Sequence, residues 1–180
     1  MLEMFNPAKA TDNIGAFLAA GGDVLIVIMI TTFFMWMFVV ERLIYFASAN
    51  SGVKKRALRS WEQRTDHYSW YARAVREKLI SEVKMAATSN IGLIKVLIAV
   101  SPLLGLLGTV TGMIEVFDVM AVTGSSNARL MAGGITKATI PTMAGLVASL
   151  SGIVAMNFID RAAKRTVSDV SDKLLLGEGV

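Results

Sequence analysis

The sequence predicts an all-helical membrane protein with three transmembrane helices, and hydropathy is the main reason. Of the 180 residues, 54% are hydrophobic, and the mean hydropathy is +0.56. Long apolar segments occupy residues 24–40, about 96–122 and 138–159. About 20 helical residues cross a bilayer core of about 30 Å, and residues 43–46 extend the first segment to that length beyond Glu41 and Arg42. A soluble chain would have too little polar surface to cover three such segments.

The segments outside these spans are also predicted to be partly helical. Residues 13–20 have the pattern of a short amphipathic helix on a membrane surface, and the N-terminus lacks the basic region and cleavage pattern of a signal peptide. Residues 41–95 contain no proline, and their apolar residues recur at helical spacing, which predicts helices that extend the spans inward. We therefore expect an amphipathic segment over 1–22, spans over 23–46, 95–122 and 138–159, a cytoplasmic helical region over 47–94, a short periplasmic loop over 123–137 and a cytoplasmic tail over 160–180.

The distribution of lysine and arginine predicts the orientation. Residues 41–95 hold eleven of them, whereas the N-terminal segment and residues 123–137 together hold only Lys9, Arg129 and Lys137. Because basic loops stay in the cytoplasm, we expect a periplasmic N-terminus and a cytoplasmic C-terminus. The net charge of +4 then reflects topology, and residues 54–64 form a solvated basic face near anionic lipid rather than a nucleic-acid site.

Several kinds of chemistry are excluded by composition. The chain has no cysteine, so it forms no disulfide, thiolate metal site or cysteine nucleophile. No nucleophile–base set and no cluster of metal ligands is visible in the sequence. We expect a protein that is not an enzyme and that has no catalytic residue, metal or cofactor.

Small and polar residues form one stripe on each of the last two spans. In the second span the stripe consists of Ser101, Gly105, Gly108, Gly112 and Glu115, which are spaced 4, 3, 4 and 3. In the third span it consists of Ala138, Thr142, Gly145, Ser149 and Gly152. Small residues let helices approach closely in lipid, so helix packing alone is one interpretation. The second interpretation is a polar pathway, because threonines and carboxylates within spans indicate function.

The motifs in these spans are familiar. Residues 101–114, SPLLGLLGTVTGMI, resemble the second span of the MotA/TolQ/ExbB proton-channel family, and residues 134–146, GITKATIPTMAGL, resemble its third-span signature. Asn157 and Phe158 suit the end of that signature, and the three spans with a large loop between the first two also agree. The short chain is more similar to ExbB than to the longer TolQ or MotA.

The resemblance implies a motor subunit of the bacterial inner (cytoplasmic) membrane. Such proteins assemble as a homo-oligomer, a pentameric ring, around a central pore that holds the spans of an ExbD-type partner. Proton flow through the pair drives a TonB-type protein that energises transport across the outer membrane. The resemblance also implies that Thr109 and Thr142 line the proton path near an essential aspartate of the partner. Ser149 and Glu115 are further pore-lining candidates.

The residues themselves indicate that this path needs a partner. The first and third spans contain no carboxylate in their cores, and Glu115 and Asp118 lie toward the outer end of the second. The missing acid must therefore come from another chain, or the path must be water alone. A Tol-type motor, a flagellar-stator-type motor and a structural membrane scaffold remain alternatives to the ExbB-type motor.

One position departs from the family pattern. ExbB and TolQ proteins usually carry an acid where this chain has Lys137, and Glu115 is the candidate for a compensating acid. If Thr109 and Thr142 lie at one depth, Glu115 is six residues and Lys137 five residues outward, so both lie roughly 8–9 Å above the threonines. The two side chains then form an ion pair, within a subunit or between neighbours. Alternatively, Lys137 extends to the outer headgroups and Glu115 meets water in the pore mouth.

Overall fold

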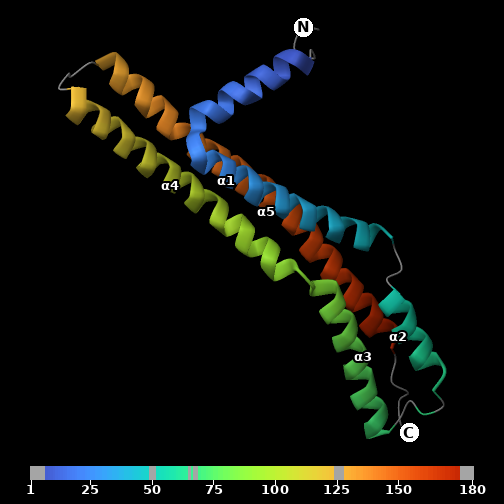
Figure 1. Cartoon of the computed structure of the whole chain (residues 1–180). Helices are drawn as coiled ribbons and strands as arrows, with labels where there is room; N and C mark the ends of the chain where they lie inside the picture. Colours follow the sequence, from blue (N-terminus) through green and yellow to red (C-terminus); the bar gives the residue numbers. More distant parts are fainter. Residues whose placement is uncertain (1–6, 49–51, 65, 67–68, 124–127, 175–180) are drawn as a thin grey trace. The chain divides into compact units, whose positions relative to one another are not determined.

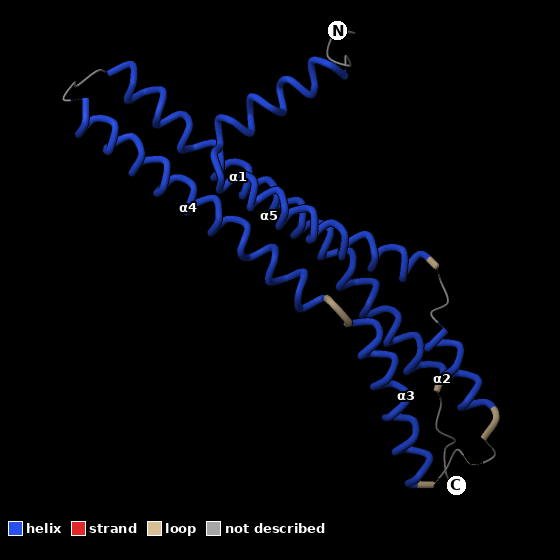
Figure 2. Tube along the Cα trace, viewed as in Figure 1, coloured by secondary structure: helices blue, strands red, loops and turns tan. Residues whose placement is uncertain are grey.

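The computed structural model describes residues 7–48, 52–64, 66, 69–123 and 128–174. Five helices run in the order α1 (Pro7–Ala47), α2 (Gly52–Glu62), α3 (Trp70–Thr88), α4 (Ile91–Thr123) and α5 (Ala128–Lys173), as Figure 1 shows. The described residues contain no strand (Figure 2), which confirms the all-helical prediction. Three stretches are long and apolar enough to cross a membrane, namely Gly21–Glu62, Trp70–Val122 and Met131–Lys173.

The chain divides into two compact units. The first comprises residues 1–35 and 96–153, and the second comprises residues 36–95 and 154–180. Helices α1, α4 and α5 each contribute residues to both units.

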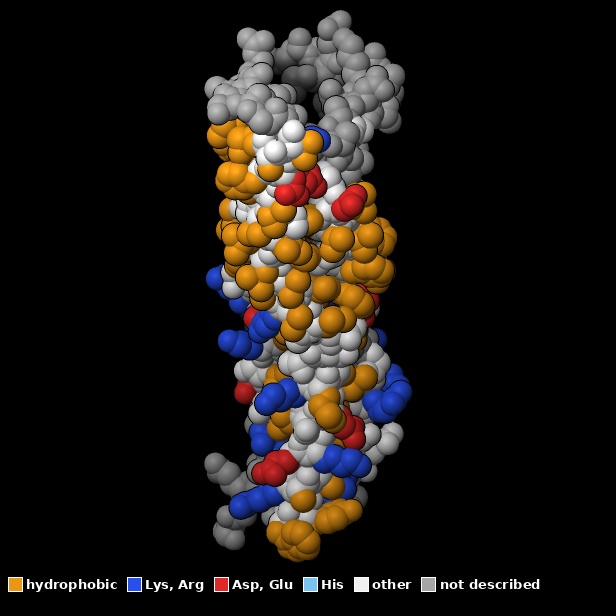
Figure 3. Space-filling view, turned by 60° about the vertical axis from the view of Figure 1, so that its left-hand side comes forward, with side chains coloured by type: hydrophobic (Ala, Val, Ile, Leu, Met, Phe, Trp, Pro, Cys, Tyr) orange, Lys and Arg blue, Asp and Glu red, His pale blue; other side chains and the backbone are white. Residues whose placement is uncertain are grey.

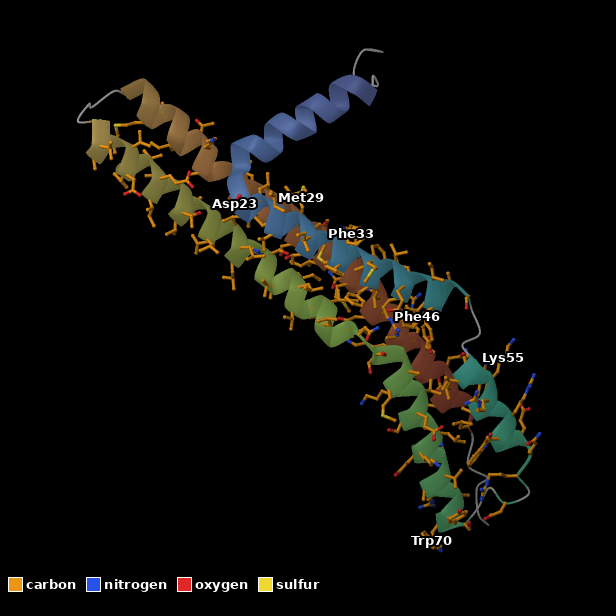
Figure 4. All side chains as sticks on the ribbon, viewed as in Figure 1. Asp23, Met29, Phe33, Phe46, Lys55 and Trp70 are labelled. Atoms are coloured by element: carbon orange, nitrogen blue, oxygen red, sulfur yellow. The ribbon has the colours of Figure 1, made fainter. Side chains whose placement is uncertain are left out.

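The first unit presents a largely apolar surface. Phe33 on α1 is 66% exposed, Leu103 on α4 is 63% exposed and Val147 on α5 is 67% exposed. Figure 3 shows hydrophobic side chains crowded over this unit, and Figure 4 labels Met29 and Phe33 on its α1 segment. Large side chains exposed in this number suit a lipid environment, because soluble monomers rarely expose such extended apolar patches.

Helix α1 is interrupted at Gly22. This glycine has φ 65° and ψ −167°, a conformation that side-chain-bearing residues rarely adopt. The residues before it and after it therefore form two separate helical segments. The break coincides with the predicted boundary between residues 1–22 and 23–46.

The predicted loop over residues 123–137 is wrong as a description of the local backbone. Helix α4 continues to Thr123 and α5 begins at Ala128, so most of the segment is helical, and residues 124–127 lie outside the described part. Packing explains the helix, because a Cβ on Gly134 would lie 2.2 Å from Val116 Cγ2, and glycine therefore permits α5 to approach α4 closely.

The second unit has a small core shared by three helices. Its buried members are Ala57 and Trp61 on α2, Ala72, Leu79 and Val83 on α3, and Val170 and Leu174 near the end of α5. Ser69 caps α3 by accepting a hydrogen bond of 3.2 Å from the Ala72 N–H. The helical prediction for residues 47–94 is confirmed over α2 and α3.

Polar contacts complete this unit. The Arg76 guanidinium on α3 donates to the carbonyl oxygens of Leu174 at 2.6 Å and Ser171 at 2.9 Å, at the C-terminal end of α5. The Lys54 ammonium on α2 forms an ion pair with Asp169 on α5. Arg76 and Lys54 thereby attach α3 and α2 to the same helix end.

A buried arginine joins α1 to the turn between α3 and α4. Arg42 is 5% exposed, and its guanidinium donates to the Glu41 carboxylate at 2.6 Å and to the Ala86 carbonyl oxygen at 3.1 Å. The Asn90 side chain donates to Glu41 at 3.1 Å, and Asn90 itself has a φ of 59°. Asparagine tolerates this left-handed conformation better than most residues, which allows the chain to turn between the two helices.

Candidate functional site

The glycines of α4 and α5 bring the two backbones together. A Cβ on Gly105 would lie 2.9 Å from Thr142 Cα, and one on Gly145 would lie 2.5 Å from the Ser101 carbonyl oxygen. A Cβ on Gly112 would lie 2.7 Å from Ala138 Cβ. Real Cβ atoms essentially never lie this close to other heavy atoms, so larger side chains do not fit here. The small-residue stripes thus pack against each other within one chain.

The same interface involves Gly108 and Gly152. A Cβ on Gly108 would lie 2.4 Å from Pro141 Cβ, and one on Gly152 would lie 2.7 Å from both Ile98 Cγ1 and Met35 Sδ. All five glycines that were predicted to pack helices therefore lie at close contacts between helices.

Thr142 contributes a hydrogen bond to this interface. Its hydroxyl donates to the Gly105 carbonyl oxygen on α4 at 2.7 Å. Thr109, which is also half-buried, donates to the Leu106 carbonyl oxygen of its own helix at 2.7 Å. Each hydroxyl uses its only hydrogen on a backbone carbonyl, so its oxygen remains available as an acceptor.

The two threonines do not lie at one depth, contrary to the supposition made from the sequence. Thr142 contacts Gly105, Pro141 contacts Gly108 and Ala138 contacts Gly112, which defines the register of α4 against α5. Thr142 is therefore about one helical turn, or about 6 Å, from the level of Thr109. The family resemblance suggested equal depth, but close packing of the glycines determines the register.

Ser149 is buried within the chain. Its residue is only 6% exposed, on an α5 face shared with Gly145 and Gly152, which contact α4 and α1 of the same chain. The physical reason is that small residues at helical spacing let neighbouring helices approach and cover the hydroxyl. A pore-lining role for Ser149 stays a prediction.

No ion pair joins Glu115 to Lys137 in the described part of the chain. Both side chains are exposed, and neither makes an ion pair with any residue that the structure describes. They nevertheless border the same cavity in the first unit. The pair between Glu115 and Lys137, within a subunit or between neighbours, stays a prediction.

This cavity lies between α1, α4 and α5 and has a volume of about 420 Å³. Its polar lining includes Asp23, Thr111, Glu115 and Lys137. Asp23 and Thr111 were not among the site residues expected from the sequence. An acid directly after the Gly21–Gly22 pair, at the start of an apolar segment, was the available signal for Asp23.

The side chains that the structure describes include no metal-binding cluster. In residues 21–48, 52–64, 66, 69–122 and 131–174, no three histidine, cysteine or acidic side chains lie together in a way that could hold a metal ion. The small residues of α4 and α5 pack the two helices together. The threonines of this interface and the acids of the cavity offer hydroxyl and carboxylate oxygens to a hydrogen-bond donor.

Known proteins that resemble the chain are transport components. The biopolymer transport protein ExbB of Pseudomonas putida is 33% identical over 103 residues, which are 56% of this chain and 31% of that protein. The ExbB of Salmonella typhimurium is 38% identical over 81 residues, or 43% of this chain and 33% of that protein. The chain thus spans about a third of the length of these two relatives.

A shorter relative aligns over most of its length. The ExbB of Helicobacter pylori is 24% identical over 157 residues, which are 87% of this chain and 88% of that protein. In addition, residues 47–172 match the family described as the MotA/TolQ/ExbB proton channel family. That match includes α2, α3, α4 and nearly all of α5. The chain therefore belongs to the MotA/TolQ/ExbB proton channel family, whose members are transport components rather than enzymes.

Proposed function

We propose that the chain is a subunit of a proton-driven motor of the ExbB–ExbD type in the bacterial inner membrane. Such a motor uses the proton-motive force to energise TonB-dependent transport across the outer membrane. The similarity to proteins named biopolymer transport protein ExbB supports this choice over the Tol-type and flagellar-stator-type alternatives. In this proposal the N-terminus is periplasmic and the C-terminus cytoplasmic.

One observation carries the proposal. Residues 96–114 of α4 and 138–159 of α5 contain no titratable side chain, but they present the hydroxyl oxygens of Thr109 and Thr142. Proton transfer through a membrane core needs protonatable groups or ordered water. A chain that supplies hydroxyl oxygens without an acid therefore fits a partner that brings a carboxyl group.

The threonine geometry suggests how such a carboxyl group would be held. Both hydroxyls donate to backbone carbonyls, so each oxygen can accept a hydrogen bond from a protonated partner acid. An ionised carboxylate has no hydrogen to donate, so these contacts favour the neutral form of the acid. The partner carboxyl would take up its proton on the periplasmic side, remain neutral beside the threonines and release the proton on the cytoplasmic side.

The two threonine hydroxyls lie at different depths along the path of the partner acid. Thr109 and Thr142 are about 6 Å apart along the helix axes, in the register defined by the glycine contacts. A partner acid that moves past the subunit would meet the two oxygens in succession. Two weak acceptors at different depths stabilise a moving neutral acid more evenly than one strong acceptor would.

The ring assembly rests on the similarity to ExbB, not on the small-residue stripes. Those stripes are satisfied by α4–α5 packing within one chain, so they do not require neighbouring subunits. The exposed apolar faces of α4 and α5 are the surfaces available to neighbours, partner and lipid. We propose a homo-oligomeric ring, a pentamer by similarity, around the spans of an ExbD-type partner.

Gene replacement tests the proposed function among its alternatives. The chain and its cognate partner would be expressed in strains that lack the ExbB pair, the Tol pair or the flagellar stator pair. We expect restored TonB-dependent uptake in the first strain, with no restored outer-membrane integrity or motility in the others. Restoration of only one of the other activities would assign the chain to that motor, and stable expression with no restored activity would favour a structural scaffold.

A further inference from the structure

The cavity of the first unit has a mixed-charge lining that helix packing does not explain. Each of the three helices supplies one charged residue, namely Asp23 on α1, Glu115 on α4 and Lys137 on α5. Figure 4 labels Asp23 at the start of the α1 segment that follows Gly22. The volume of about 420 Å³ lies within the range of small-molecule sites and exceeds the space that one or two waters would fill.

The three charges lie close together along the helix axes. Val24 contacts Gly108 and Ala138 contacts Gly112, so Asp23 and Lys137 lie near the levels of residues 109 and 113 of α4. Glu115 lies about two residues further along α4. The three charged positions therefore fall within about 9 Å along the axis.

These charges have no partners in the described part of the chain. Neither Asp23, Glu115 nor Lys137 forms an ion pair or a side-chain hydrogen bond with a residue that the structure describes. Two carboxylates and one ammonium leave a net charge of −1 on the cavity wall. An unpaired set of this kind is unfavourable near the edge of a bilayer core unless a ligand or water completes it.

The cavity lining also contains a hydroxyl oxygen that can accept a hydrogen bond. The Thr111 hydroxyl donates to the Leu107 carbonyl oxygen at 3.0 Å, so its oxygen is free to accept. The cavity therefore offers several acceptors for a cationic donor and one cation, Lys137, for an anion.

The chemistry of this lining matches a zwitterionic headgroup. A primary ammonium carries three N–H donors, which suit two carboxylates and a hydroxyl oxygen, and a phosphate beside it suits the Lys137 ammonium. Apolar residues at the same cavity, Val116, Val119 and Met120, offer a surface to acyl chains. We propose that the cavity binds the phosphoethanolamine headgroup of an aminophospholipid.

This proposal rests on the membrane position in the proposed function, which puts the cavity at the periplasmic end of the spans. Two other phospholipids serve as comparisons. A phosphatidylcholine headgroup has the same charges but no N–H donor, and a phosphatidylglycerol headgroup has the phosphate but no cation. Of these three lipids, only phosphatidylethanolamine has ammonium N–H donors. A preference for it over the other two therefore indicates recognition of the headgroup in the cavity rather than general attraction to lipid.

A lipid competition experiment tests the proposal. The chain in complex with its partner would be equilibrated with vesicles of equal parts phosphatidylethanolamine, phosphatidylglycerol and phosphatidylcholine, and retained lipids would be counted by native mass spectrometry. We expect several-fold enrichment of phosphatidylethanolamine over both other lipids. Equal retention of the three, or preference for phosphatidylglycerol or phosphatidylcholine, would overturn the proposal without any variant.

Variants then locate the site. Asp23→Asn with Glu115→Gln should abolish the preference, whereas Asp118→Asn should retain it, because Asp118 lies on the same helix but does not line the cavity. Equal enrichment in the double variant and the wild-type complex would contradict the proposed headgroup contacts. Proton flux measured on the same samples distinguishes the failure of the lipid site from the failure of the motor function. Enrichment of phosphatidylethanolamine without proton flux would contradict only the motor function. Proton flux without this enrichment would contradict only the lipid site.

Discussion

The Thr142 hydroxyl on α5 donates a 2.7 Å hydrogen bond to the Gly105 carbonyl oxygen on α4. The contact exists because Gly105 lacks a side chain, since a Cβ there would lie 2.9 Å from Thr142 Cα. This contact is one of the three that define the register of the two helices. The same hydroxyl oxygen is a proposed contact for the partner acid. Thr142 therefore contributes to helix packing and, in this proposal, to function.

Replacing Thr142 should separate these two contributions. Thr142→Val keeps the shape and removes the hydrogen bond, so the free energy of unfolding should fall by about 0.5–1.5 kcal/mol. Thr142→Ser keeps the hydroxyl and should retain both stability and energised transport better than the valine variant. Thermal unfolding in detergent and transport assays in cells measure the two effects. Full transport in a Thr109→Val, Thr142→Val double variant would remove the proposed hydroxyl role.

Gly145 should tolerate no side chain. Its Cβ would lie 2.5 Å from the Ser101 carbonyl oxygen and 3.3 Å from Gly105, and both are backbone atoms that cannot rotate away. We expect Gly145→Ala to lower the free energy of unfolding by about 1–3 kcal/mol through overpacking. Gly133→Ala is the matched control on α5, because no atom lies within 4 Å of its Cβ. The control should be neutral or stabilising by up to about 1 kcal/mol, because alanine favours helix more than glycine does. Equal stability of both variants would contradict the close-contact interpretation.

Arg76 should stabilise the C-terminal end of α5. Its guanidinium donates to two carbonyl oxygens of the last turn, those of Ser171 and Leu174. Arg76→Gln should lower the free energy of unfolding by about 1–3 kcal/mol, because charge-assisted hydrogen bonds are lost and the carbonyls lose their partner. The exposed Arg73 on the same helix is the control, and Arg73→Gln should change stability little. Hydrogen exchange of the last α5 turn would report whether the effect is local, and unchanged protection in the Arg76 variant would argue against the cap.

The ion pair between Lys54 and Asp169 should make the stability of the second unit depend on acid pH. The hydrogen bond from the Lys54 ammonium lowers the pKa of the Asp169 carboxyl, and its charge adds to that effect. A lowered folded-state pKa gives stability that is present above the ordinary aspartate pKa, about 4, and lost as pH falls through the lowered value. Both side chains are partly exposed, so the contribution should not exceed about 1 kcal/mol.

Asp169→Asn tests this pH dependence. The stability difference between wild type and this variant should be constant near neutral pH and should shrink as pH falls below about 4. Glu77→Gln, which removes an exposed carboxylate on α3, provides the control. A difference that grows toward low pH would show that the sign is wrong.

The sequence predicted the features that depend on periodicity. The three apolar helices and the packing face of α4 follow from residue spacing, because a helical stripe of small residues must face another backbone when large apolar residues occupy the other side. Gly105, Gly108 and Gly112 illustrate this, since all three contact α5. Helices α2 and α3 were predictable for the same reason.

Features that depend on contacts between distant segments were not predictable in the same way. The sequence predicts a loop over residues 123–137, but Gly134 packs against Val116, and α5 begins at Ala128. The sequence places Glu41 and Arg42 within the first predicted span, near its inner end, but it does not indicate that Arg42 is buried and donates to Ala86 of α3. The cavity requires the break at Gly22 together with residues of three helices, so no single stretch of sequence indicates it.

The proton pathway is tested most directly by flux into liposomes. The chain alone, and the chain with the proposed ExbD-type partner, would be reconstituted with an internal pH-sensitive dye and given the same membrane potential. We expect no flux above that of empty liposomes for the chain alone, because residues 24–40, 96–114 and 138–159 contain no titratable side chain. We expect measurable flux with the partner, and loss of that flux when the membrane carboxylate of the partner is replaced by its amide. Equal flux from the chain alone and from the complex would contradict the claim that the partner supplies the missing acid.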